Sequence, residues 1–325
     1  MASRACFGSP PVVRNRAPIP TPRREGEVLE NRPSSTGAGL TRSAGPVLKV
    51  LAAAALWGIS GVVARSLFQR AVDPSHLVQV RMLVGGAALL PLLAWRRSLA
   101  VPARLWPALG GYAALMALLQ LSYFEALAAA GGAVAVFLQY TAPLLVAAWE
   151  SLRARALPPR PVLLALLAAI AGSALLVLPG GSLRVPPAGF AWGLASAAAM
   201  AAATVVSGAL RRRGVGALPL VAWGFLLGSL AFVPRRTPWV ALATVPDWPY
   251  FLYVAVFATA VPFALYVSAL GALAGTVTML LAMLEPALAA ALAWAFLGEA
   301  LAPAQLAGGL LILGGVALAA ATARR

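Results

Sequence analysis

Ten apolar runs of about 20 residues each, separated by short polar breaks, constrain the fold of this chain more than any other feature. A run of that length spans the hydrocarbon core of a bilayer as an α-helix, which satisfies its own backbone polar groups where water is absent. Only 10% of the residues are charged, against about 25% in soluble domains. The pattern predicts an all-α membrane protein with ten transmembrane helices, at approximately 47–68, 76–95, 105–128, 132–151, 161–179, 188–210, 217–233, 248–270, 275–297 and 303–322.

The formal net charge of +16 is distributed as in a multi-pass membrane protein, which argues against nucleic acid as a partner. With the N-terminus in the cytoplasm, many basic residues fall on the cytoplasmic side and few on the outer side. The cytoplasmic set is Lys49, Arg96, Arg97, Arg104, Arg153, Arg155, Arg160, Arg211, Arg212, Arg213, Arg324 and Arg325, and the outer set is Arg70, Arg184, Arg235 and Arg236. We therefore expect a cell-membrane protein with both termini in the cytoplasm.

Residues 1–45 are polar and rich in Pro, Arg, Ser and Gly, with no apolar period. This composition predicts a disordered basic tail on the cytoplasmic side. An alternative interpretation is that the start codon is assigned too far upstream, so that the tail is not translated.

The two halves of the chain share a pattern. YFEALAAAGGAV, beginning at Tyr123, matches YVSALGALAGTV, beginning at Tyr266, and each is followed at the same spacing by a proline inside an apolar run, Pro143 and Pro286. A Trp-Gly pair also occurs early in each half. We interpret residues 46–180 and 186–322 as two copies of a five-helix unit. Because five is odd, the second copy enters the membrane from the opposite side, and a substrate site is expected between the halves near the midplane.

These residues resemble a known family. LEPALAAALAWAFLGEALAPAQLAGGLLILGGVALA (residues 284–319) resembles the end of an EamA-type repeat of the drug/metabolite transporter superfamily, and LWGISGVVARSLF followed by Arg81 resembles its beginning. The resemblance covers about residues 47–322 and implies ten helices around a central cavity that opens to either side in turn. It also implies a carrier of small metabolites or an efflux protein.

The first repeat departs from the family pattern. The Gly298–Glu299 pair near the end of the second proline-bearing helix has Ala156 at the matching place in the first repeat, where Glu150 lies closer to its proline. The two halves are therefore not equivalent. We expect Glu150 and Glu299 to lie at helix ends near water.

Glu285 and Pro286 stand together in the middle of an apolar run. An ionised carboxylate is costly in hydrocarbon, and a proline inside a helix costs about 3 kcal/mol. One interpretation is a proton site or a contact for a cationic substrate group. The other is a neutral or hydrogen-bonded carboxyl group that only stabilises the helix break.

Several other polar residues fall within the apolar runs and are candidates for the site. Arg81 and Glu125 lie at similar depth and are compatible with an ion pair, either structural or part of a gate. Pro143 is predicted to break its helix as Pro286 does, as a hinge or site-lining residue or as a simple kink. The remaining candidates for the cavity wall, or for contacts between helices, are Trp57, Gln139, Tyr140 and Tyr266.

The chain has one cysteine, one histidine and no Walker A sequence. These observations argue against a histidine-based catalytic triad, a multi-histidine metal site and ATP hydrolysis, so neither a metal nor a cofactor is predicted. We predict a secondary transporter, an exporter of an amino acid or amphipathic compound that works by alternating access and exchanges protons at Glu285. A non-transporting membrane scaffold or sensor and a membrane enzyme are the alternatives, and the oligomeric state is left open.

Overall fold

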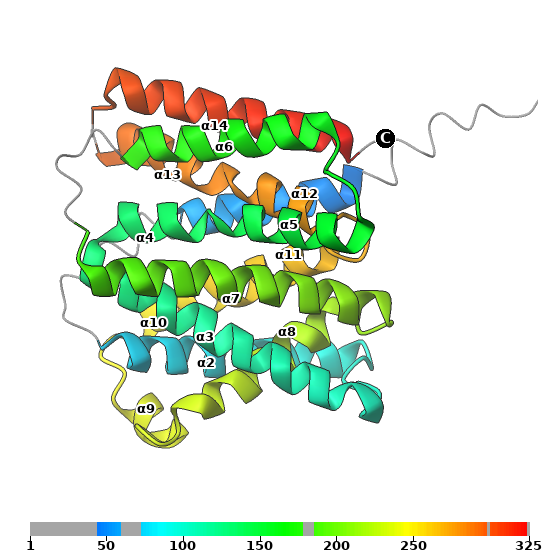
Figure 1. The fold of residues 1–325 in the computed structure, drawn as a ribbon. Coiled ribbons are helices and arrows are strands. Elements are labelled where there is room, and N and C mark those ends of the chain that lie inside the picture. The colour runs from blue at the N-terminus through cyan, green and yellow to red at the C-terminus, as the bar shows by residue number, and fades with distance from the viewer. Residues whose placement is uncertain (1–43, 60–72, 178–184, 298–299, 324–325) are drawn as a thin grey trace, which may run out of the picture.

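The structure, a computed structural model of the chain, describes residues 44–59, 73–177, 185–297 and 300–323. Within these ranges the regular structure is helical. Most of the predicted tail, residues 1–43, lies outside the described residues, and so does the Gly298–Glu299 pair. The long helices run roughly parallel to one another, as expected for a bundle that crosses a bilayer (Figure 1).

The helices of the described residues follow one another along the chain. In chain order they are an N-terminal helix Ala44–Ile59, then α2 (Pro74–Trp95), α3 (Trp106–Ala130), α4 (Gly132–Gln139), α5 (Ala142–Ala154), α6 (Arg160–Val177), α7 (Pro187–Arg212), α8 (Ala217–Ser229), α9 (Pro238–Ala243), α10 (Trp248–Ala255), α11 (Val261–Ala269), α12 (Gly275–Ala282), α13 (Leu284–Leu297) and α14 (Pro303–Thr322). The short helix α9 had not been predicted.

Eight helical segments in the described ranges are long and apolar enough to cross a membrane. They correspond to eight of the ten predicted runs, with boundaries within a few residues. The other two runs are represented by shorter apolar helices, Ala44–Ile59 and Ala217–Phe232, and residues 60–68 of the first predicted run lie outside the described residues. The prediction of a multi-pass helical membrane protein is therefore confirmed.

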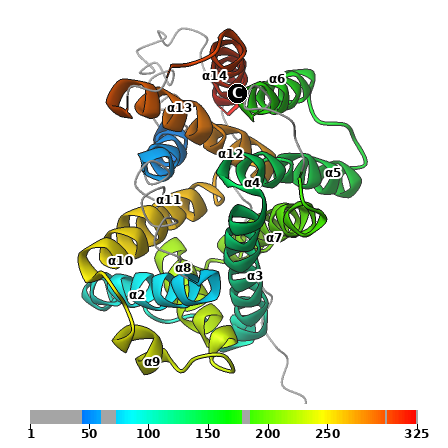
Figure 2. The same ribbon diagram turned by 90° about the vertical axis from the view of Figure 1, so that its left-hand side faces the viewer.

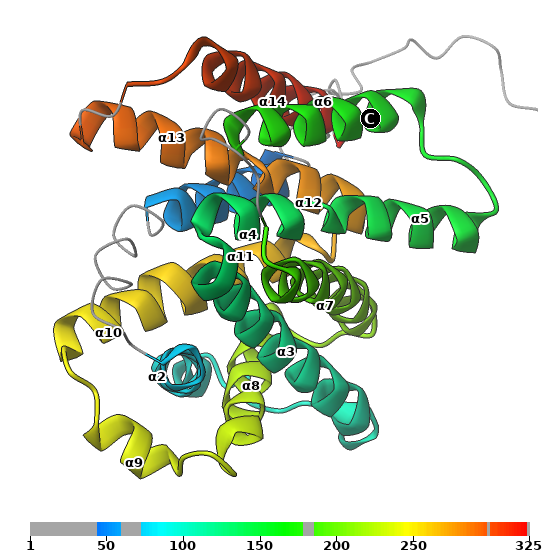
Figure 3. The same cartoon turned by 60° about the vertical axis from the view of Figure 1, so that its left-hand side comes forward.

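Two of the membrane-spanning segments are interrupted. α4 and α5 lie in line with a break at Tyr140 and Thr141, and α12 and α13 lie in line with a break at Met283 (Figure 3). Pro143 and Pro286 follow these breaks by two or three residues. Proline has no N–H to donate to the carbonyl four residues earlier, so it cannot continue the α-helical hydrogen bonding.

A third segment is widened rather than broken. Residues Val256–Ala260 form a π-helical turn between α10 and α11. Pro262 follows this turn and removes a backbone donor, which accounts for the local change of hydrogen bonding. The Thr259 hydroxyl donates to the Val254 carbonyl five residues earlier, at 2.7 Å.

α6 and α14 form a close crossing through small residues. A Cβ atom on Gly172 would lie 2.5 Å from the Gly308 carbonyl oxygen, and one on Gly308 would lie 2.6 Å from that of Gly172. Glycine at both positions allows the two backbones to touch, which is a common way to join helices in membranes. Figure 2 shows this pair at one edge of the bundle, with α2, α8 and α9 at the opposite edge.

Candidate functional site

A cavity of about 630 Å³ lies between the two broken helices. Its wall includes most of the residues that the sequence singles out: Trp57, Arg81, Gln139, Tyr140, Pro143, Glu285 and Pro286. Gln139 and Ala282, the residues four positions before the two prolines, also line it. The backbone interruptions therefore face the same space, as in carriers that bind substrate at unwound helices.

The cavity extends from the middle of the bundle toward one end only. Its lining includes Gly131 and Gly132, where α3 ends and α4 begins, and Leu176 and Val177, where α6 ends. We call this the open end. The opposite end, where α5 ends and α12 begins, contributes no residue to the lining and is called the closed end.

Glu285 lies at the start of α13, partly buried, with its carboxylate on the cavity wall. The Tyr140 hydroxyl, from the break between α4 and α5, donates to Glu285 Oε2 at 2.6 Å. This bond joins the two broken helices. No cation lies within ion-pair distance of the carboxylate among the described residues, so its one hydrogen-bond donor in that part of the chain is a neutral hydroxyl.

The helix around Glu285 packs closely against the N-terminal helix. A Cβ atom on Gly58 would lie 3.1 Å from the Glu285 carbonyl oxygen and 3.2 Å from Leu288 Cβ. Glycine at this position therefore lets the N-terminal helix approach the backbone of α13. The neighbouring Trp57 then reaches the cavity wall, where its ring meets Phe263 edge to face with centroids 5.2 Å apart.

Arg81 on α2 is the buried cation of the cavity, with 6% of its surface exposed. Its Nε and Nη2 atoms both donate to Thr259 Oγ1, at 2.9 and 2.6 Å, and its guanidinium lies 4.8 Å from the Phe124 ring centroid. Thr259 belongs to the π-helical turn, and such turns are frequent at functional sites. The cation–π contact and the hydroxyl together hold the guanidinium in place.

The expected pairing of Arg81 with Glu125 is not found. Arg81 binds Thr259 across the bundle instead. Glu125 is partly exposed and does not line the cavity. It lies next to Phe124 in α3, and successive residues of a helix point in different directions, so Phe124 meets Arg81 while Glu125 does not.

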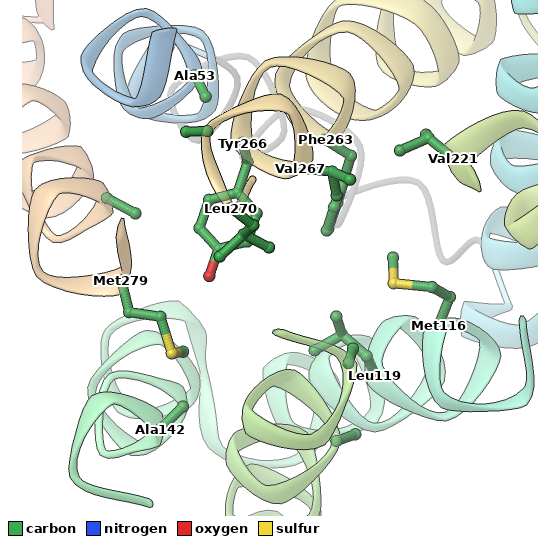
Figure 4. Packing of buried hydrophobic residues seen from close by; sticks show 14 of the residues in the cluster. Ala53, Met116, Leu119, Ala142, Val221, Phe263, Tyr266, Val267, Leu270 and Met279 are labelled. Carbon is green, nitrogen blue, oxygen red and sulfur yellow. The ribbon is translucent and has the colours of Figure 1, made fainter. Parts of the chain in front are cut away.

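Tyr266 also lies away from the cavity, in the packed region toward the closed end. Its hydroxyl is 2.9 Å from Thr204 Oγ1, which connects α11 to α7. Figure 4 shows Tyr266 projecting from α11 into the core near Met279 of α12 and Ala142 of α5. Gln139 has a similar bridging role while also lining the cavity, since its side-chain nitrogen donates to Ser196 of α7 at 2.9 Å.

Sequence inspection missed some polar residues of the wall, among them Gln120 and Gln305. Gln120 is 4% exposed and its side-chain nitrogen has no hydrogen-bond partner in the described part of the chain. Its position one turn before Tyr123 and Phe124 in α3 was the available signal, because residues three and four apart share a helix face. Within the described ranges no group of three or more His, Cys, Asp or Glu residues could hold a metal ion.

Among the described residues, the arrangement thus places one acidic and one basic side chain, Glu285 and Arg81, on the wall of a single cavity, each bonded to a neutral hydroxyl group. Aromatic side chains, including Trp57, Tyr123 and Phe124, supply much of the remaining wall. Such a site is suited to a small molecule with apolar surface and polar or charged ends.

Comparison with known proteins agrees with this class of molecule. The model of the EamA-like transporter family matches residues 45–178 and 187–321, so the chain contains two copies of the family's domain. The chain belongs to the EamA-like transporter family.

Individual relatives are similar along most of their length. The chain is 29% identical over 295 residues to the uncharacterized inner membrane transporter YicL of Salmonella typhimurium, covering 86% of this chain and 96% of that protein. It is 28% identical over 285 residues to the uncharacterized transporter YwfM of Bacillus subtilis, covering 86% and 94%. A protein of known crystal structure shares the fold with a TM-score of 0.70 at 21% identity, over 86% of this chain and 99% of that one.

Proposed function

We propose that this protein is a secondary transporter that exports a small amino acid or amphipathic metabolite by alternating access. The observation that carries the proposal is the cavity between the two broken helices, with Glu285 and Arg81 on its wall. A cationic group of the substrate would bind Glu285, and an anionic or hydrogen-bond-accepting group would bind Arg81. The aromatic side chains would cover the apolar part.

The proposed architecture is ten helices in two inverted repeats. The crossing of α6 and α14 supports it. At the spacing that relates Pro143 to Pro286, Gly172 corresponds to Gly315 and Ala165 to Gly308. A Cβ atom on Gly172 would lie 2.5 Å from the Gly308 carbonyl oxygen, and one on Gly315 would lie 2.9 Å from that of Ala165, so the same contact occurs twice, as expected around a pseudo-twofold axis. Basic residues at the closed end support a cytoplasmic location for that end, since α5 ends beside Arg153 and Arg155 and α7 ends with Arg211 and Arg212. The structure then corresponds to an outward-open state.

Glu285 is the proposed coupling residue. An ionised carboxylate with only a neutral donor is costly at membrane depth, so the site gains free energy when it binds either a proton or a cationic group. Competition between the two would couple export of the substrate to entry of protons. Tyr140 would keep the carboxylate oriented in both cases, because its hydroxyl can donate to the charged form and accept from the neutral form.

The test is transport by the full chain in sealed vesicles with an imposed pH gradient. Vesicles would be loaded with a panel of amino acids and cationic dyes, and wild type compared with Glu285→Gln. Glu125→Gln is the matched control, because Glu125 is a partly buried acid that does not line the cavity.

We expect wild type to transport at least one compound at a rate that depends on the pH gradient. The Glu285→Gln variant should lose this dependence, and the Glu125→Gln variant should keep it. Equal gradient-dependent movement by wild type and Glu285→Gln would overturn the coupling role. If no compound of the panel is transported, the scaffold or sensor interpretation is favoured over transport.

A further inference from the structure

The two broken helices meet differently at the two ends of the bundle. At the closed end, α5 packs directly against α12. In the repeat, α5 corresponds to α13 and α12 corresponds to α4. Residues of α4, including Gly132 and Ala133, and of α13, including Ala290 and Ala293, lie on the cavity wall. One of two equivalent helix crossings is therefore packed, and the other borders the cavity.

The packed crossing is held by Glu150, near the end of α5. Its Oε1 accepts the Gly275 N–H at 2.8 Å, and its Oε2 accepts the Thr276 hydroxyl at 2.6 Å and the Thr276 N–H at 3.4 Å. These donors belong to the first turn of α12, whose N-cap residue Ala274 provides no side-chain cap. A carboxylate from one repeat thus caps a helix of the other, and the partial positive charge of the helix N-terminus strengthens the contact.

The backbone at this point leaves little room for a side chain. A Cβ atom on Gly275 would lie 3.0 Å from Val146 Cγ1, 3.1 Å from Glu150 Oε1 and 3.4 Å from Thr204 Cγ2. Thr204 in turn bonds the hydroxyl of Tyr266. Four helices, α5, α7, α11 and α12, therefore close this end around Glu150 and Gly275.

The second repeat has no equivalent of this acid. Ala293 follows Pro286 at the same spacing as Glu150 follows Pro143, and it lies on the cavity wall. The first turn of α4 correspondingly has no side-chain cap, because its N-cap is Gly131. In the part of the chain that the structure describes, this set of hydrogen bonds is therefore found at one end of the bundle only.

We propose that Glu150 is the latch of the gate at the closed end, and that its hydrogen bonds to α12 stabilise the state in which the cavity reaches the open end. Transport requires these bonds to break so that α5 and α12 separate. This inference rests on the proposed alternating-access function. Removing the latch shifts the conformational equilibrium toward opening of the closed end by about tenfold or more, since hydrogen bonds to charged groups contribute that much to an equilibrium constant.

The experiment measures accessibility of single cysteines in the reconstituted full chain, without substrate. The one native cysteine, Cys6, is first replaced by serine. One reporter is Val146→Cys, at a fully buried position in the latch crossing, and the other is Ala133→Cys, at an exposed position on the cavity wall near the open end. The probe is a membrane-impermeant maleimide, and the measured quantity is the labelling rate.

In the Glu150→Ala variant, we expect the rate at the Val146 position to rise about tenfold and the rate at the Ala133 position to fall. Thr276→Val, which removes one donor and keeps the acid, should give a smaller change in the same direction. Glu125→Gln should change neither rate. Unchanged labelling rates in a folded Glu150→Ala protein would overturn the latch proposal. A higher rate at the Val146 position with no lower rate at the Ala133 position would also overturn it, because that result indicates local fraying of the helix crossing.

The labelling assay separates this inference from the proposed function. If the latch hypothesis is wrong but the protein is a transporter, wild type transports substrate and both labelling rates are the same in wild type and in Glu150→Ala. If transport is wrong but the two states exist, the rates respond to Glu150 although no compound moves.

Discussion

Thr259 is expected to be essential for holding Arg81, and replacing it by valine tests this directly. Valine has nearly the same shape as threonine and lacks the hydroxyl group. Thr259 is fully buried, and its oxygen accepts both hydrogen bonds that the Arg81 guanidinium donates within the described residues. Loss of hydrogen bonds to a charged group costs about 1.5–3 kcal/mol. We therefore expect Thr259→Val to lower the free energy of unfolding by about 2 kcal/mol.

The measurement is equilibrium unfolding in mixed micelles, with helix content followed by circular dichroism. Thr259→Ser is the matched control, because it keeps the oxygen and removes only a methyl group. It should lose less than the valine variant. If Thr259→Val were as stable as wild type, or less affected than Thr259→Ser, the hydroxyl would not be what stabilises buried Arg81, and the reasoning would be refuted.

Two further predictions concern the helix crossing and the acid. Gly172→Ala should lower the unfolding free energy by about 1–3 kcal/mol, because the added carbon meets a backbone carbonyl of α14. Gly309→Ala should be neutral or stabilising, because that site is open. Thermal unfolding of both variants in one detergent distinguishes them. Tyr140→Phe removes the hydroxyl that donates to Glu285, so we expect the pH dependence of gradient-driven transport to shift while the protein still folds. An unchanged pH profile would contradict the orienting role.

The sequence predicted the parts of the fold that depend on hydrophobicity and on proline. Runs of apolar residues have one stable arrangement in a bilayer, so the eight long spans follow from composition alone. The helix interruptions are similarly local, because Pro143 and Pro286 each remove a backbone donor. The cavity then gathers the residues that flank those interruptions, such as Tyr140 and Glu285.

The contacts between distant helices were harder to predict. A single threonine such as Thr259 in an apolar run gives no sign that it will accept hydrogen bonds from Arg81, because that depends on how α2 packs against the π-helical turn. The shared depth of Arg81 and Glu125 suggested a pair, but depth does not specify the direction in which a side chain points around its helix. Glu150 was expected in water for the same reason, although it caps a helix of the other repeat.

The two acids of the broken-helix pairs differ in how their charge is compensated, and this difference indicates how the repeats have specialised. Glu150 accepts three hydrogen bonds from the start of α12, whereas Glu285 accepts one within the described residues, from Tyr140. A carboxylate that is already satisfied favours a fixed contact, and one that is under-satisfied gains more from a ligand or a proton. The first repeat would then supply the latch and the second the binding acid. Moving the acid from position 150 to its counterpart, with Glu150→Ala and Ala293→Glu combined, should therefore reverse which end is held closed, and the labelling rates at the Val146 and Ala133 positions measure this.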